Sequence, residues 1–242
     1  MKPWELLGET RTPDGSLLTL TRHVSEIVIM ANGKTLMSNR AHGSEEAMAA
    51  MVCPHLAALD DPHVLIGGLG MGFTLRATLD LLPPTAIVTV AELIPAVVEW
   101  HRGPLGPLAN HPLKDPRVRV EVNDVAAVLR ANAAEKRRPF DAIMLDVDNG
   151  PAAFTSEENR GLYTSQGLAT TRLALSPGGV LAIWSAFDDR KFVQHLTYAG
   201  FAVKVEHVRA RLKKGGPRHT IFLAYPGGAP AKAARSRRRA TS

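Results

Sequence analysis

The sequence predicts an α/β fold: a doubly wound, seven-stranded and mostly parallel sheet with an antiparallel C-terminal hairpin, preceded by a small N-terminal β appendage. From residue 64 onward, short apolar runs rich in β-branched residues alternate with helical segments. This alternation is typical of a parallel sheet covered on both faces. The last two runs, 201–209 and 219–225, are joined by a link without helical periodicity. That link favours an antiparallel closing pair.

The other five strands are expected at 64–68, 86–92, 118–124, 140–146 and 179–185. Helices are expected at 73–82, from Pro95, after Asp124, at 157–175 and at 188–199. The first helix ends at Pro83-Pro84 because proline has no amide hydrogen to donate. A Ser-Pro-Gly-Gly turn at 176–179 is expected to end the fourth helix.

The N-terminal segment has a different pattern. Residues 16–38 alternate between apolar and polar side chains, and Asn32-Gly33 is a good hairpin turn. The last sixteen residues are rich in glycine, proline, alanine, serine and arginine. We therefore expect a small β-hairpin region at 1–45, a main domain at 46–226 and a disordered basic tail at 227–242.

Composition narrows the functional class. The chain has 242 residues, 45% of them hydrophobic, and no apolar run approaches the roughly 18 residues that a membrane-spanning helix needs. No export signal is visible, so a soluble, cytoplasmic protein without a membrane partner is expected. Five basic residues of the tail account for all but one unit of the net charge of +6, so a nucleic-acid partner is not expected. The single cysteine and the spacing of the histidines predict no metal site.

The strongest local motif is the glycine run Gly68, Gly70 and Gly72, between the first parallel strand and the first helix. Glycines there let the backbone turn tightly and approach a ligand at the carboxyl edge of the sheet, where open α/β sheets bind ligands. A nicotinamide or flavin fingerprint would require glycine at position 73, which is Phe73, and no phosphate-binding Walker loop is present. A purely structural turn is the alternative.

Two acidic residues end the next two strands. Glu92 follows the glycine run by twenty residues, a position suited to accept hydrogen bonds from both ribose hydroxyls of a nucleoside. Asp124 ends the third strand, at a level suited to meet the base. Helix N-capping is the alternative for both residues. Together with the glycine run, these residues predict a nucleoside-binding crevice.

The segments VLIGGLGMGFTLRATL, VTVAELIPAVVEW, VEVNDVAAVL and FDAIMLDVDNGPAAFTSEENRGLYT resemble the Rossmann-like class I S-adenosylmethionine-dependent methyltransferases, and within them the spermidine synthase branch. The resemblance covers residues 16–226. It implies that Glu92 binds the ribose, Asp124 the adenine, and that Asp146 contacts the cofactor and accepts the proton of an attacking amine. It also implies that Asp148 helps to hold the acceptor, and that the protein forms a homodimer.

The chain departs from the family pattern at several places, two of which concern the glycine loop and the catalytic loop. Met71 replaces an aspartate that meets the amine of decarboxylated S-adenosylmethionine, and Asn149 replaces the second acidic residue of the catalytic loop. Glu45 and Glu46 are candidates for further acceptor contacts, a solvated helix face being the alternative. Trp184 is a candidate pocket wall or a core residue.

From these departures we expect methyl, or other alkyl, transfer from S-adenosylmethionine to a small polar or amine acceptor. One alternative is aminopropyl transfer from decarboxylated S-adenosylmethionine. A second is a non-catalytic scaffold whose basic tail associates with nucleic acid.

Overall fold

The computed structural model describes residues 3–147, 161–211 and 216–227. Four strands form an antiparallel N-terminal sheet in the order β1-β2-β3-β4: β1 (Glu5–Arg11), β2 (Leu17–His23), β3 (Glu26–Ala31) and β4 (Lys34–Ser38). The seven strands of the main sheet are ordered β10-β11-β9-β8-β5-β6-β7. They are β5 (His63–Gly67), β6 (Ile87–Glu92), β7 (Val118–Val122), β8 (Phe140–Leu145), β9 (Leu175–Ser185), β10 (Phe201–Arg209) and β11 (Arg218–Pro226).

The expected topology is confirmed. Strands β5 to β9 run parallel, and β10 and β11 form the expected antiparallel closing pair. The helices are α1 (Gly43–Leu56), α2 (Phe73–Leu81), α3 (Pro95–Arg102), α4 (Val125–Ala134), α6 (Ser165–Ala174) and α7 (Arg190–Tyr198). The described residues also contain three short 3-10 helices: η1 (Gly106–Ala109), η2 (Pro112–Lys114) and η3 (Gly161–Tyr163).

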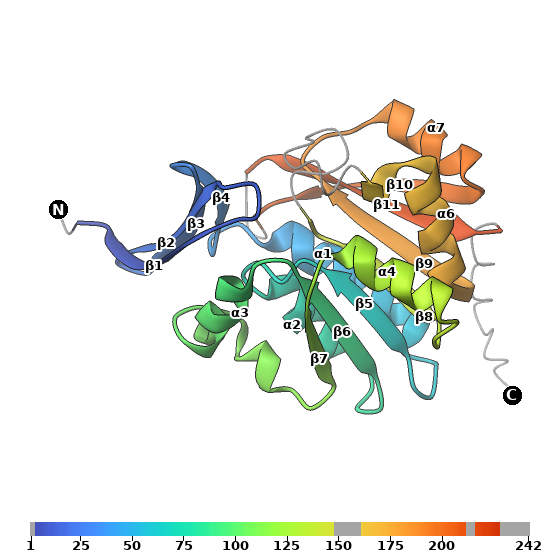
Figure 1. The fold of residues 1–242 in the computed structure, drawn as a ribbon, viewed down its shortest axis with the longest axis horizontal. Helices are drawn as coiled ribbons and strands as arrows, with labels where there is room; N and C mark the ends of the chain where they lie inside the picture. Colours follow the sequence, from blue (N-terminus) through green and yellow to red (C-terminus); the bar gives the residue numbers. More distant parts are fainter. Residues whose placement is uncertain (1–2, 148–160, 212–215, 228–242) are drawn as a thin grey trace, which may run out of the picture.

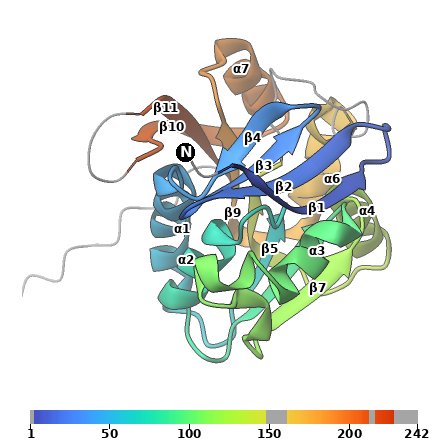
Figure 2. The ribbon, with the colours of Figure 1, turned by 90° about the vertical axis from the view of Figure 1, so that its left-hand side faces the viewer.

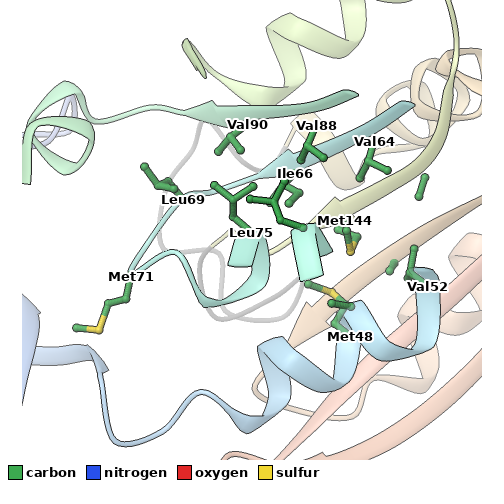
Figure 3. Close-up of a cluster of buried hydrophobic side chains, with 14 of the residues drawn as sticks. Met48, Val52, Val64, Ile66, Leu69, Met71, Leu75, Val88, Val90 and Met144 are labelled. Carbon is green, nitrogen blue, oxygen red and sulfur yellow. The ribbon is translucent and has the colours of Figure 1, made fainter. Parts of the chain in front are cut away.

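Alternate residues of the central strands belong to two separate hydrophobic cores. Val64 and Ile66 of β5 pack on one face with side chains of α1, α2 and α3. Leu65, between them, packs on the other face with α4, α6 and α7. Successive side chains point to opposite faces of the sheet because the strand is pleated. The main sheet therefore lies between two helical layers (Figure 1), and the first core is drawn in Figure 3.

The N-terminal sheet lies beside the main body (Figure 1). In the view turned by 90°, it lies in front of the strands of the main sheet (Figure 2). Its inner side chains, among them Leu18 and Ile29, belong to the same hydrophobic cluster as Leu69 and Val97 of the main domain. Gly8 of β1 lies directly under the ring of Trp100 of α3, where a Cβ would collide with the indole. The small sheet is thus packed onto the main body through shared apolar contacts.

Three details differ from the expectation. The N-terminal segment adds β1, which the sequence pattern did not reveal because its pairing with β2 contains an irregularity near Gly8. Within the described residues the fourth helix starts at Ser165, where the Thr164 hydroxyl accepts a hydrogen bond from Gly167 N at 3.1 Å. The expected Ser-Pro-Gly-Gly turn is part of β9, which begins at Leu175 opposite Phe140. The tail expected to be disordered lies, beyond residue 227, outside the described residues.

No helix in the described ranges is both long enough and apolar enough to cross a membrane.

Replacing Leu65 by alanine is expected to lower the free energy of unfolding by about 3 kcal/mol, because its side chain is fully buried in the sheet and leaves a cavity. Leu173→Ala is the matched control, since Leu173 is 72% exposed and its truncation is expected to cost less than about 0.5 kcal/mol. Urea unfolding of both variants measures the difference. Equal losses would contradict the assignment of Leu65 to the core.

Candidate active site

A cavity of about 540 Å³ opens at the carboxyl edge of the main sheet, under the N-terminal sheet. The loops after four parallel strands line its floor: Gly68 and Gly70 after β5, Glu92 to Ile94 around the end of β6, Asn123 to Val125 after β7, and Asp146 and Val147 after β8. Its roof comes from β2, β3 and β4, including Leu18, Ile29 and Met37. This is the edge at which open α/β sheets bind ligands.

Three glycines of the predicted loop take left-handed backbone conformations, with φ of 89° at Gly68, 49° at Gly70 and 83° at Gly72. A Cβ on Gly68 would collide with the carbonyl oxygen of Asp146. The conformation and the close approach both require glycine here. Gly68 and Gly70 line the cavity, whereas Gly72 caps the start of α2 and faces His101 instead.

His101 supports the glycine loop through a hydrogen bond to its backbone. Its side chain is buried, and Nε2 lies 3.0 Å from the carbonyl oxygen of Gly70. A carbonyl only accepts, so the hydrogen is on Nε2. Burial lowers the pKa of His101, which keeps the ring neutral. No local pattern in the sequence joins α3 to the loop, so this role of His101 was not predicted.

Glu92 ties together two turns that line the cavity. One carboxylate oxygen accepts a hydrogen bond from Leu69 N at 2.9 Å and the other from Ile94 N at 2.8 Å. Burial raises the pKa of Glu92, and the hydrogen bonds from the two amides counteract part of that rise. Each oxygen can accept further hydrogen bonds, and Glu92 lines the cavity. It can therefore hold the loop and bind a ligand's hydroxyl groups at once.

Asp124 is the N-cap of α4, where its Oδ1 accepts a hydrogen bond from Ala126 N at 2.9 Å. The same residue lines the cavity beside Asn123. Capping occupies one carboxylate oxygen, and the other lies 3.7 Å from Arg130. The capping interpretation and the ligand-binding interpretation are thus compatible in this geometry.

Asp146 follows β8 at the floor of the cavity. Its amide donates to the carbonyl of Gly67 at 2.9 Å, which continues the pairing of β5 and β8. Its Oδ2 accepts a hydrogen bond from the Thr74 hydroxyl at 2.7 Å, and burial raises its pKa. The predicted partner Asp148 lies outside the described residues. Thr74, missed from the sequence, is recognisable afterwards as the second residue of the helix that follows the glycine loop.

The structure separates the two glutamates at the start of α1. Glu46 faces His42, with 2.7 Å between Oε1 and Nδ1. Glu45 instead accepts a hydrogen bond from the buried Ser44 hydroxyl at 2.6 Å. Burial, together with the nearby charge of Asp146, raises the pKa of Glu45 to about 7. The charges of Glu45 and Asp146 therefore influence each other, although Glu45 does not line the cavity itself.

Two other candidates take structural positions. Met71 is 4% exposed and belongs to the same hydrophobic cluster as Leu69, although its side chain points away from Leu69 in Figure 3, and it is not among the residues that line the cavity. Trp184 is half-buried against the same core, with its ring edge-on to His219 at 4.6 Å between centroids. Among the described residues, no three histidine, cysteine or acidic side chains come together to hold a metal ion.

Gly68→Ala is expected to destabilise the protein by about 3 kcal/mol. Alanine is unfavourable at the positive φ of this position, and its Cβ would also collide with the carbonyl oxygen of Asp146. Gly15→Ala is the matched control, with φ of 83° and no atom within 4 Å of the new Cβ. Its expected cost is about 1 kcal/mol. Thermal unfolding distinguishes the two, and equal costs would show that Gly68 does not depend on its contact with Asp146.

Glu45→Gln is expected to stabilise the protein at alkaline pH. The pKa of Glu45 is raised from 4.5 to about 7, so folding favours the protonated carboxyl and stability is lost as the pH rises through about 7. Near pH 8 the glutamine variant should be about 2 kcal/mol more stable than the parent, and the gain should shrink toward pH 5. Urea unfolding at several pH values measures it. Glu46→Gln is the control, and a gain independent of pH would contradict the burial of this charge.

Comparison with known proteins matches residues 45–204 to the spermine/spermidine synthase domain family. The polyamine aminopropyltransferases of Mycobacterium tuberculosis (strain H37Rv) and Mycobacterium bovis (strain AF2122/97) are 30% identical over 151 residues, which is 60% of this chain. The aligned region spans only 28% of the length of those relatives.

Among solved structures, the spermidine synthase of Thermotoga maritima superposes with a TM-score of 0.68 at 18% identity, covering 92% of this chain and 73% of that one. A spermidine synthase in complex with the transition-state analogue AdoDATO gives 0.67 at 17% identity, covering 92% and 72%. These likenesses confirm the fold expected from the sequence. The family match runs from α1 into β10 and includes every loop that forms the floor of the cavity. The chain therefore belongs to the spermine/spermidine synthase family.

Proposed function

We propose that the chain is an aminopropyltransferase that moves the aminopropyl group of decarboxylated S-adenosylmethionine to an amine. The observation that carries the proposal is Asp146, a carboxylate with a raised pKa at the floor of the cavity, in a chain of the spermine/spermidine synthase family. The curated relatives are polyamine aminopropyltransferases. A solved relative binds AdoDATO, described as a transition-state analogue.

The expectation of methyl transfer is wrong. It depended on Met71 in place of an aspartate, and the family match and the curated relatives favour aminopropyl transfer instead. The physical reason is the direction of the side chain. Met71 packs into the apolar core and does not line the cavity, so its identity does not report which sulfonium compound binds there.

The nucleoside part of the donor fits the described lining. Glu92 is proposed to accept hydrogen bonds from the ribose hydroxyls, and Asp124 with Asn123 to meet the adenine. The apolar side chains of the roof, Leu18, Ile29 and Met37, would exclude water from the sulfonium. Removing water strengthens the electrostatic effect of Asp146 on the reacting groups.

Chemistry at the site requires a neutral amine, because a protonated nitrogen has no free electron pair. Asp146, held in place by Thr74, accepts a proton from the bound ammonium, and its raised pKa suits that task. The amine nitrogen then forms a bond to the carbon next to sulfur. The carbon–sulfur bond breaks and its electron pair stays on sulfur. Positioning of the amine in line with that bond supplies much of the rate.

The acceptor is proposed to be a small amine with one or two ammonium groups. Among the described carboxyls with a raised pKa in this region, Glu92 is engaged by the amides of Leu69 and Ile94, which leaves Asp146 and Glu45 to balance the charge of the acceptor. A homodimer and a cytoplasmic location stay predictions.

Asp146→Asn is expected to lower kcat for aminopropyl transfer by at least about a hundredfold, because the amide cannot take the proton. Mass spectrometry of the amine product, with decarboxylated S-adenosylmethionine and a diamine such as putrescine, measures it. Asp188→Asn is the control, since that carboxylate is half-exposed and faces His207 at 3.9 Å. Methylation of the amine from intact S-adenosylmethionine, without any aminopropyl product, would contradict the proposed function.

A further inference from the structure

The glycine loop is built from the residue type with the greatest conformational freedom. Gly68, Gly70 and Gly72 fill three of its five positions, and all three have positive φ. Glycine loses more backbone entropy on ordering than any other residue, so such a loop needs contacts from outside to hold one shape. Gly68 and Gly70 line the cavity in which the donor is proposed to bind. The contacts that hold the loop therefore act on donor binding.

These contacts come from two elements. The backbone amides of Gly68 and Leu69 donate hydrogen bonds to the end of β6, at 2.8 Å and 2.9 Å. The carbonyl oxygen of Gly70 instead accepts a hydrogen bond from Nε2 of His101, at 3.0 Å. His101 lies on α3, thirty-one residues after Gly70. Its ring thus joins the loop to a helix that is distant in the sequence.

The His101 ring also packs against the loop. A Cβ on Gly72 would lie 2.7 Å from Cε1 of the ring, so the ring occupies the space that a side chain at this position would need. Met37 of the roof would lie 3.2 Å from a Cβ on Gly70. Gly70 is therefore confined by the roof through Met37 and by α3 through His101.

The His101 ring is suited to be a fixed donor and not an acid or a base. The ring is buried and does not line the cavity. Among the described residues Nδ1 has no hydrogen-bond partner, so a second hydrogen on that atom would be buried without an acceptor. Burial accordingly lowers the pKa of His101. The form that fits is a neutral ring with its hydrogen on Nε2.

We propose that His101 is a positioning residue that sets the affinity for the donor by holding the glycine loop in the shape that binds it. The inference rests on the proposed function for the identity of the donor. Without the hydrogen bond the loop samples other shapes, and the dissociation constant rises as the competent fraction falls. His101 takes no part in the steps at Asp146, so kcat at saturating donor should stay unchanged.

The rival explanation is that the His101 ring only fills space beside the loop. Two substitutions of similar size separate the explanations. The side-chain amide nitrogen in His101→Gln is as many bonds from Cα as Nε2 of histidine, so it can donate to the Gly70 carbonyl. The side chain in His101→Met fills similar space without a donor. Val98→Ala is the matched control, because Val98 is buried on the same helix and does not line the cavity.

The experiment measures the affinity for decarboxylated S-adenosylmethionine by calorimetry, kcat with putrescine at saturating donor, and stability by urea unfolding. His101→Met is expected to weaken donor affinity about tenfold, the usual effect of one lost hydrogen bond, with kcat unchanged. His101→Gln is expected to recover most of that affinity. Val98→Ala is expected to lose stability and to keep the parent affinity. Nitrogen NMR of the parent should show the His101 hydrogen on Nε2.

The outcomes separate this inference from the proposed function. Parent-like affinity in His101→Met would overturn the inference, and so would equal losses in His101→Met and His101→Gln. A fall in kcat at saturating donor without loss of affinity would also overturn it. A hydrogen on Nδ1 in the parent would do so even if His101→Met does not fold. A parent that binds the donor but forms no aminopropyl product would overturn the proposed function alone, whereas a parent that does not bind the donor would overturn both.

Discussion

The approach of two backbones at the centre of the sheet is the constraint on which the site depends. Strands β5 and β8 pair as neighbours, and the Asp146 amide continues this pairing by donating to Gly67. Gly68 then lies against the Asp146 carbonyl, so closely that no side chain fits between them. This contact fixes where the glycine loop turns and where the Asp146 carboxylate lies. The glycine loop and Asp146 are therefore both positioned by paired strands inside the main sheet.

Burial of acidic groups is a second feature of this region. Glu92, Asp146 and Glu45 all have raised pKa values because the surrounding protein removes water from them. Each is compensated locally: backbone amides donate to Glu92, Thr74 donates to Asp146, and Ser44 donates to Glu45. Burying a carboxyl group lowers the stability of the fold, and its hydrogen bonds offset only part of that loss. Such groups are typical of sites that bind cations or move protons.

The N-terminal sheet has a functional position as well as a structural one. It shares a hydrophobic cluster with α3 and the glycine loop, and its strands roof the cavity. Met37 of β4 would lie 3.2 Å from a Cβ on Gly70, so roof and floor approach closely at the loop. A donor bound in the cavity would touch both sheets. Changes in the small sheet are therefore expected to act on binding as well as on folding.

The sequence by itself determined the architecture of the main sheet, its two helical layers and the edge at which the cavity opens. Periodic apolar runs report which residues face a core, and glycines or acids at strand ends report where a parallel sheet exposes its carboxyl edge; both are local signals. Only the tertiary structure decided that Thr74 holds Asp146, that Ser44 reaches His219, and that the N-terminal strands roof the cavity. Met71 was misjudged because a loop has no periodicity that tells which way a side chain points. These features depend on contacts between segments far apart along the chain, which no local pattern encodes.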